Sequence, residues 1–237
     1  MLIEGPDVSQ LNPTMTLLDL HRSESQQISG RDANFTFTTR EMALLFGAIL
    51  PLALLLRLLF LGAKSLSEDE IYSVLIVRQH LPAFWKTVTH SEANMALYYV
   101  MLRFWIHLGQ SEFAIRIFSV VPALATVVAL YLLGTRAFGR KVGSLATLLL
   151  AINGFHVEYS QNARSYSLLV FLVALSSLFF LQSVREGSRK NWIRYVITST
   201  LAIYAHLFAV LVLLAHGVFL LFVPRREAEV VPPLVET

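Results

Sequence analysis

Long runs of apolar residues alternate along this chain with short polar connections. The first run, residues 42–63, would rise about 33 Å as a helix, which is enough to cross the hydrocarbon core of a bilayer. The last run, residues 192–223, is long enough to fold back at His206 as two short helices. The remaining apolar runs cover residues 113–133, 142–155 and 167–184. The pattern predicts an all-α, polytopic integral membrane protein with about six transmembrane helices.

Residues 95–106 form a further apolar and aromatic segment that could either span the membrane or lie flat on it. Arg103 interrupts the segment, and about 15 helical residues fall short of the usual ~20 for a crossing. The flat arrangement, with a cytoplasmic N-terminus, fits the enrichment of positive charge in cytoplasmic loops. It places on that side Arg136, Arg140, Lys141, Arg185, Arg189, Lys190, Arg194, Arg225 and Arg226. We therefore expect the acidic clusters around Asp69 and Glu158 on the exoplasmic face of the cell membrane.

This topology divides the chain into a mobile cytoplasmic tail (residues 1–40), a transmembrane domain (41–223) and a second cytoplasmic tail (224–237). The first exoplasmic loop covers residues 64–112 and the second covers residues 154–165. The first loop is rich in aromatic residues, whose amphipathic rings favour the headgroup level of a bilayer. Interfacial helices are expected in it at residues 68–80, 83–89 and 94–108.

The composition agrees with a membrane protein and excludes other classes. Hydrophobic residues make up 55% of the chain, charged residues 15%, and the mean hydropathy is +0.60, which is too apolar for a soluble core of this size. Cysteine is absent, so any bound metal would need His and carboxylate ligands. The net charge of +3 is spread over the loops, which argues against a nucleic acid partner.

The string Ser67-Glu68-Asp69-Glu70 follows the first apolar run and fits a capping box, in which Ser67 caps a helix and Glu70 reaches back to its amide. That motif by itself can account for Glu70. Asp69 is not needed for the cap, and from the first helical turn its carboxylate could act as a general base on a substrate hydroxyl. The alternative is a solvated acid that the helix dipole stabilises.

Residues 154–166 crowd polar side chains between two apolar runs. Arg164 among them suits a phosphate group, because a guanidinium binds phosphate with two parallel hydrogen bonds. The alternatives are that Arg164 extends to lipid headgroups or pairs with Glu158. His206, with His156 and a carboxylate, could bind a divalent ion or a phosphate, whereas a lone histidine between helices is more often hydrogen-bonded structure.

Arg57 and Arg116 lie near helix ends on the expected outer side, and extending to the headgroups is their simpler explanation. Neither arginine is given a catalytic role. His216 lies further inside the last helix and is expected to pack or to form a hydrogen bond there.

Four strings of the chain resemble the GT-C superfamily of membrane glycosyltransferases, in particular protein O-mannosyltransferases, aminoarabinose transferases and Rgt-like envelope glycosyltransferases. The resemblance extends over residues 41–223. The strings are Leu66-Ser67-Glu68-Asp69-Glu70-Ile71-Tyr72-Ser73, Leu97-Tyr98-Tyr99, Ser111-Glu112-Phe113-Ala114-Ile115-Arg116 and His156-Val157-Glu158-Tyr159-Ser160-Gln161-Asn162-Ala163-Arg164-Ser165-Tyr166.

The resemblance implies that a sugar passes from a polyprenyl-phosphate donor to a hydroxyl or amine of an envelope glycan, lipid or protein. It implies that Asp69 is the catalytic acid-base residue with Glu70 as its neighbour, and that Glu158 is the acidic residue of the second loop. A divalent metal ion is a candidate cofactor, with Glu158, His156 and His206 as candidate ligands. Substrate contacts are expected from Glu92, Tyr98, His156, Gln161, Arg164, Tyr166 and His206.

Two features depart from the resemblance. Relatives commonly carry a Pro-Pro pair before Leu-Tyr-Tyr, whereas this chain reads Glu92-Ala93-Asn94-Met95-Ala96, so a stiff start of that helix is lost. Relatives also continue with more helices beyond about six spans. An alternative function is therefore a truncated or catalytically silent module that binds polyprenyl phosphate or a partner chain supplying the missing helices. A transporter is less favoured, because its acidic residues should lie near the membrane centre.

Overall fold

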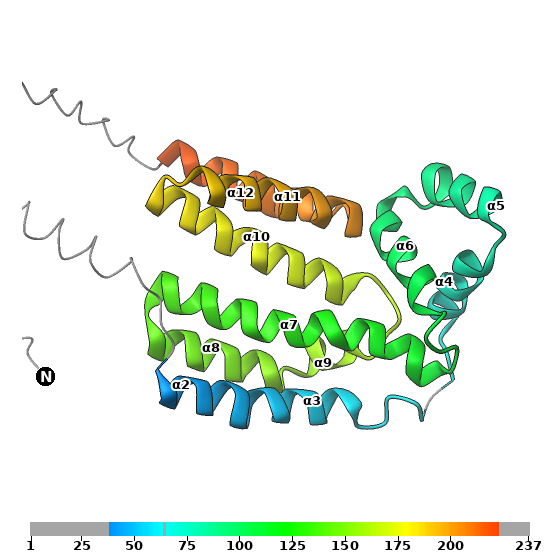
Figure 1. The fold of residues 1–237 in the computed structure, drawn as a ribbon, viewed down its shortest axis with the longest axis horizontal. Helices are drawn as coiled ribbons and strands as arrows, with labels where there is room; N and C mark the ends of the chain where they lie inside the picture. The colour runs from blue at the N-terminus through cyan, green and yellow to red at the C-terminus, as the bar shows by residue number, and fades with distance from the viewer. Residues whose placement is uncertain (1–37, 64, 223–237) are drawn as a thin grey trace, which may run out of the picture. The chain divides into compact units, whose positions relative to one another are not determined.

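The computed structural model describes residues 38–63 and 65–222, and every regular element among them is a helix (Figure 1). The tails predicted for residues 1–40 and 224–237, with Arg225 and Arg226, lie outside the described residues except for residues 38–40, where the first helix begins. The chain divides into two units, Met1–Met42 and Ala43–Thr237, and the second contains the helical bundle. The prediction of an all-α fold is confirmed for the part of the chain that is described.

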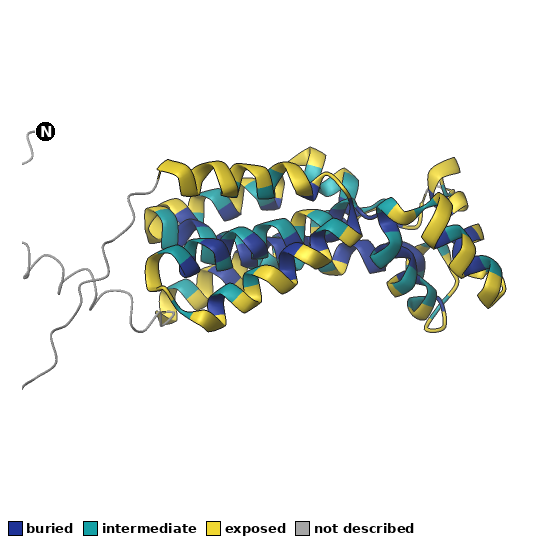
Figure 2. Ribbon diagram, turned by 90° about the horizontal axis from the view of Figure 1, so that it is seen from above, coloured by how far each residue is buried: buried dark blue, intermediate teal, exposed yellow. Residues whose placement is uncertain are grey.

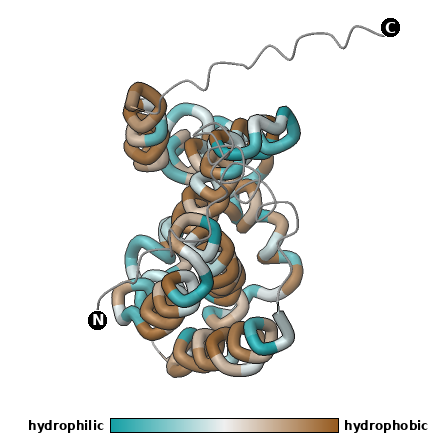
Figure 3. The backbone as a smooth tube through the Cα atoms, turned by 90° about the vertical axis from the view of Figure 1, so that its left-hand side faces the viewer, coloured by the Kyte–Doolittle hydropathy of each residue, from teal (hydrophilic) through white to brown (hydrophobic). Residues whose placement is uncertain are grey.

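Two long helices, α7 (Glu112–Phe138) and α10 (Tyr166–Glu186), pack side by side through the helical bundle. A first helix runs through α2 (Thr39–Leu44), a π-helical segment η2 (Leu45–Ile49) and α3 (Leu50–Leu58). Its α3 part packs with α8 (Arg140–Ile152) against α7. On the other side, α11 (Arg189–Ala205) and α12 (Ala209–Phe222) pack against α10. Buried positions gather between the helices and apolar residues cover their outer faces (Figures 2 and 3).

Within residues 38–63 and 65–222, three helices are long and apolar enough to cross a membrane, and they cover Thr39–Leu58, Glu112–Phe138 and Tyr166–Glu186. The other predicted spans are helices as well, but α8, α11 and α12 have 13, 17 and 14 residues, fewer than the usual ~20. The structure therefore supports three membrane-spanning helices, and the count of six stays a prediction.

The polar connections fall at two ends of the bundle. The α7–α8 and α10–α11 connections lie at one end, and the segments that precede α7, that lead from α8 to α10, and that join α11 to α12 lie at the other (Figure 1). We call the second end the loop end. The three strings that carry Asp69, Glu158 and His206 therefore share one end of the bundle.

The segment between the first helix and α7 folds into short helices, close to the three that were predicted. They are α4 (Glu68–Arg78), α5 (Leu81–Lys86) continued by the π-helical η3 (Thr87–Ser91), the 3₁₀ turn η4 (Ala93–Met95) and α6 (Ala96–Trp105). With 10 residues, α6 rises about 15 Å, half of what a bilayer core requires. It therefore does not span on its own, and its position at the membrane surface stays a prediction.

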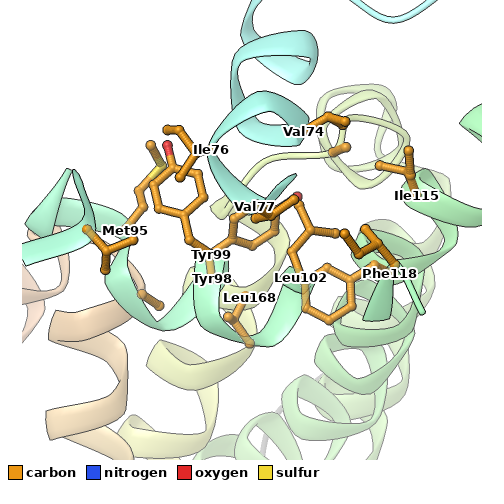
Figure 4. Packing of buried hydrophobic residues seen from close by; sticks show 14 of the residues in the cluster. Val74, Ile76, Val77, Met95, Tyr98, Tyr99, Leu102, Ile115, Phe118 and Leu168 are labelled. Carbon is orange, nitrogen blue, oxygen red and sulfur yellow. The ribbon is translucent and has the colours of Figure 1, made fainter. Parts of the chain in front are cut away.

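A hydrophobic core joins these short helices to the bundle. Tyr98, Tyr99 and Leu102 of α6 are almost fully buried, and they pack between Val77 of α4 and Phe118 of α7 (Figure 4). The rings of Tyr98 and Phe118 lie 5.4 Å apart. This packing fixes α4 and α6, and with them their polar residues, relative to the start of α7.

Helices α7 and α8 approach each other through glycine. A Cβ atom added to Gly143 would stand 2.7 Å from the backbone nitrogen of Thr135, and one added to Gly134 would stand 3.0 Å from the Cα of Gly143. Small residues allow this approach in membrane helices, where close van der Waals packing drives association. The tight turn at Gly139, whose φ is +91°, joins the two helices.

Candidate active site

The first turn of α4 presents Asp69 at the loop end. Ser67 accepts a hydrogen bond from the amide of Glu70 (3.4 Å), and the Glu70 carboxylate accepts one from the amide of Ser67 (2.8 Å). The capping box predicted from the sequence is thus confirmed. Asp69 is exposed, and its carboxylate forms no hydrogen bond or ion pair with the described residues. The cap therefore fixes the helix start and leaves the Asp69 carboxylate available.

Glu70 points the other way, into the protein, where its side chain is 1% exposed. Its carboxylate accepts from Arg116 Nε and Nη2, each at 2.9 Å, and from the amide of Ala163 at 2.8 Å. Burial by itself would raise the pKa of Glu70, but these hydrogen bonds and the positive charge of Arg116 outweigh it and lower the pKa to about 2. Glu70 thus joins α4, α7 and the second loop as a permanent carboxylate.

The expected extension of Arg116 to the headgroups is wrong. Its side chain is 6% exposed and also donates to the carbonyl oxygens of Leu61 and Ser65. Glu70, in the first turn of α4, gives this guanidinium the counter-charge and the hydrogen bonds that a buried cation requires. Arg116 is therefore part of the protein interior beneath Asp69.

Arg164 follows directly after the residue that Glu70 holds. Its Nη1 atom donates to the carbonyl oxygen of Asp69 at 3.4 Å, while its own carbonyl accepts from Ser119 Oγ at 3.3 Å. Arg164 is half-buried, its Nε atom is enclosed without a hydrogen-bond partner, and it does not pair with Glu158 in the described part of the chain. Its guanidinium therefore retains the capacity to bind an anion.

His206 lies close enough to Arg164 to feel its charge. Burial lowers the pKa of His206, and the positive charge of Arg164 lowers it further. The His206 ring, which is 7% exposed, lies 6.0 Å from the ring of Tyr166, at the start of α10. The structure thus brings Asp69, Arg164, Tyr166 and His206 to the loop end, with the nearly fully buried Tyr98 packed beneath them.

His156 faces a different partner from the one predicted. Its Nδ1 atom lies 2.7 Å from Nη2 of Arg57, which is fully buried and also donates to the carbonyl oxygens of Ala53 and Ala151. The expected extension of Arg57 to the headgroups is therefore wrong. Burial, followed by the Arg57 charge, lowers the pKa of His156 to about 4, so its ring is neutral.

These contacts do not fit the candidate metal ion. No group of three or more His, Asp or Glu residues that could hold a metal occurs among the described residues. His156 turns one ring nitrogen toward a cation, which disfavours a second cation beside it. Glu158 lies exposed on α9 (Gly154–Ser160), a short helix absent from the sequence-based expectation. No reaction step is therefore assigned to a metal.

Gln161 uses its side-chain amide to cap the first helix. Its Nε2 atom donates to the carbonyl oxygens of Leu56, Arg57 and Leu59, at 3.2, 3.2 and 2.9 Å. The last carbonyls of a helix lack partners within the helix, so this side chain completes its C-terminus. Gln161 was predicted to contact substrate, and in this structure its amide nitrogen is committed to holding the second loop on α3.

Two tyrosines that the sequence alone did not assign to the site surround Glu92. Tyr72 donates to one carboxylate oxygen of Glu92 at 3.1 Å, and Tyr99 donates to the other at 3.3 Å. Tyr72 lies three residues after Asp69, so both lie on one face of α4. That spacing was the available signal, since it places an aromatic hydroxyl one turn from the candidate base. Through its bond to Tyr72, Glu92 is therefore held beside the face of α4 that carries Asp69.

The comparison of sequences places this bundle of apolar helices among the membrane glycosyltransferases of the GT-C type. Residues 91–235 match the sequence profile of the dolichyl-phosphate-mannose-protein mannosyltransferase family, and the chain belongs to that family. The matched residues include Glu92, Glu158, Arg164 and His206 and begin after Asp69. Neither the curated proteins nor the solved structures contain a significant match to the chain.

Proposed function

We propose that this chain transfers a sugar from a polyprenyl-phosphate donor to an acceptor hydroxyl or amine, at the loop end of the bundle and on the exoplasmic face of the membrane. The acceptor belongs to an envelope glycan, lipid or protein. The observation that carries the proposal is Arg164, a half-buried guanidinium without a carboxylate partner among the described residues, beside the exposed acid Asp69, in a chain of this family.

Asp69 is assigned the role of general base. It takes the proton from the acceptor, whose oxygen or nitrogen then forms a bond to the anomeric carbon of the sugar. The bond between that carbon and the phosphate oxygen breaks, and its electron pair leaves on the polyprenyl phosphate. The base must be solvent-accessible and close to the acceptor, and the first turn of α4 supports this because it leaves the carboxylate of Asp69 exposed.

Arg164 and His206 are assigned to the departing phosphate. A guanidinium can donate two parallel hydrogen bonds to phosphate oxygens and stabilises the negative charge that develops there. The long Arg164 contact to the carbonyl of Asp69 can be exchanged for a stronger one to an anion. Glu158 and Glu92 are assigned to the acceptor, and the two tyrosine hydroxyls on Glu92 support this by fixing the direction of its carboxylate.

Transfer is tested in membranes that contain the protein and are supplied with radiolabelled polyprenyl-phosphate sugars. The wild-type chain should release polyprenyl phosphate and label an acceptor, and Asp69→Asn should lower the rate by about 10²-fold or more, the usual contribution of a general base. Glu68→Gln is the matched control, since Glu68 is exposed in the same helical turn. Full activity in Asp69→Asn would exclude Asp69 as the base.

Donor binding distinguishes the proposed function from a catalytically silent module. Binding of the labelled donor without any transfer would favour the module, whereas a loss of binding in Arg164→Met would support the phosphate contact. The side of the membrane is tested by single cysteines, because the chain contains none. Cysteines at positions 69 and 158 should react with an impermeant maleimide from the same side, and labelling from opposite sides would exclude the proposal.

A further inference from the structure

The side chain of Asn94 connects two segments of the loop end that lie 113 residues apart in the chain. Its Oδ1 atom accepts a hydrogen bond from the amide of Leu207 at 2.8 Å. Its Nδ2 atom lies 3.5 Å from Nε2 of His206. One asparagine therefore joins η4, just before α6, to the turn between α11 and α12.

The backbone that leads into α6 is irregular, and no local cap fixes the start of that helix. Within residues 87–96 the chain passes from the π-helical η3 to the 3₁₀ turn η4 and then to α6. Glu92 and Met95, at the two junctions, have nearly the same non-helical dihedral angles, and no side chain caps η4 or α6. A helix start without a cap relies on contacts from outside the segment.

On the other side, Asn94 accepts from the Leu207 amide, which donates to no other group among the described residues. The amide of His206 bonds to the carbonyl of Ala202 and that of Ala209 to the carbonyl of His206, while the Leu207 amide between them bonds to Asn94. The Phe208 amide donates to Nδ1 of His206 at 3.2 Å. A neutral ring that accepts at Nδ1 carries its proton on Nε2, so the approach of Asn94 Nδ2 to Nε2 is a packing contact between two donors. The hydrogen bond that joins the two segments is the one from the Leu207 amide to Asn94.

The contacts continue from both ends of this connection into the candidate site. Two residues before Asn94, Glu92 accepts hydrogen bonds from Tyr72 and Tyr99. On the other side, the ring of His206 lies 6.0 Å from the ring of Tyr166. The side chain of Asn94 therefore connects Glu92, which is assigned to the acceptor, with His206, which is assigned to the phosphate. We propose that Asn94 is a positioning residue that holds Glu92 and His206 in one fixed arrangement. The inference rests on the proposed function. In place of the Pro-Pro pair that this chain lacks, the Asn94 contact fixes the start of α6.

The connection itself is tested without any enzymatic readout. In nanodiscs, Asn94→Ala should increase hydrogen exchange at the amides of residues 92–99 and of residues 206–209. Asn191→Ala is the control, because the side-chain amide of Asn191 also donates a hydrogen bond, to Glu186, at the opposite end of the bundle. It should leave both segments protected. Unchanged exchange in Asn94→Ala would overturn the proposal, whether or not the chain transfers sugar.

The use of the connection is tested by separating kcat from KM. In Asn94→Ala the residues around Glu92 should still bind the acceptor and those around His206 the donor, so KM should change by less than about threefold. The kcat should fall about tenfold or more, because misplaced reactants react slowly. Asn94→Asp keeps an oxygen for the Leu207 amide and should retain most of kcat. An unchanged kcat in Asn94→Ala, or equal losses in both variants, would overturn the positioning role. A wild-type chain without transfer would instead reject the proposed function, and hydrogen exchange would then decide on the connection alone.

Discussion

Replacing Glu70 by glutamine removes the carboxylate that pairs with the buried guanidinium of Arg116. The wild-type carboxylate receives two hydrogen bonds from Arg116 and one each from the amides of Ser67 and Ala163. Each carboxylate oxygen accepts two of these bonds, and a glutamine offers a single oxygen, so two of the four donors lose their partner. The second loop and the start of α7 are then held less firmly on α4.

The size of the effect follows from the pKa of Glu70. A fall from the ordinary value of 4.5 to about 2 corresponds to about 3 kcal/mol of preference for the charged form in the folded protein. Because the folded pKa is depressed, this stability is present above pH 4.5 and is lost as the pH falls from 4.5 toward 2. At neutral pH we expect Glu70→Gln to lower the free energy of unfolding by about 3 kcal/mol, which agrees with the ~3–5 for breaking a buried ion pair.

The free energy of unfolding is measured by titration with SDS from mixed micelles, followed by tryptophan fluorescence. Trp105 reports on this region, because its indole donates to the carbonyl of Ala114 at 2.8 Å, two residues before Arg116. Glu68→Gln is the control, as an exposed acid of the same turn. Arg116→Met and the double variant complete a thermodynamic cycle. Effects of the two single changes that add within about 0.5 kcal/mol would refute the reasoning, because coupled neighbours should deviate by more.

Three further predictions concern the helices that hold the site. The pKa of His156 is lowered to about 4, so between pH 6.5 and 4 the unfolded chain binds the proton more readily than the folded one. The free energy of unfolding should therefore fall as the pH is lowered through this range, and His156→Gln should flatten that part of the measured profile. Gln161→Leu removes the donor to three carbonyls at the end of α3 and should cost about 1–3 kcal/mol in thermal unfolding. Gly143→Ala should lower Tm more than Gly47→Ala, since only the former Cβ would meet Thr135; equal Tm values would contradict this.

Much of the fold could be predicted because apolar length and local caps act over short stretches of chain. The run at residues 113–133 became the core of α7, and the capping box placed the start of α4 at Glu68. Helix ends were less predictable where a polar side chain intervenes. The apolar run at residues 142–155 ends as α8 at Ile152, because Asn153 accepts from the amide of His156 and caps α9 instead. Its length alone did not indicate that change.

The contacts of the candidate site were less predictable, because they join residues distant in the chain. Arg57 and Arg116 look alike in the sequence, each being an arginine near the end of an apolar run, and lipid headgroups were the nearest partner to consider. Their actual partners, His156 and Glu70, are 99 and 46 residues away. Asn94 carried no signal for the same reason, since its partner Leu207 becomes a neighbour only when α11 has folded back beside α6.

The charges at the loop end are separated by depth, and this separation suits the proposed chemistry. Arg57 is fully buried against a neutral imidazole, and Arg164 is half-buried without a carboxylate partner among the described residues, so two cations lie within the protein uncompensated by an acid. Asp69 and Glu158, in contrast, are exposed. Sugar transfer needs a base that reaches the acceptor from solvent and cations that stabilise the departing phosphate at the membrane side. If the reaction has these requirements, reversing the charge of Arg164 should impair donor binding, whereas neutralising Asp69 should impair the transfer step alone.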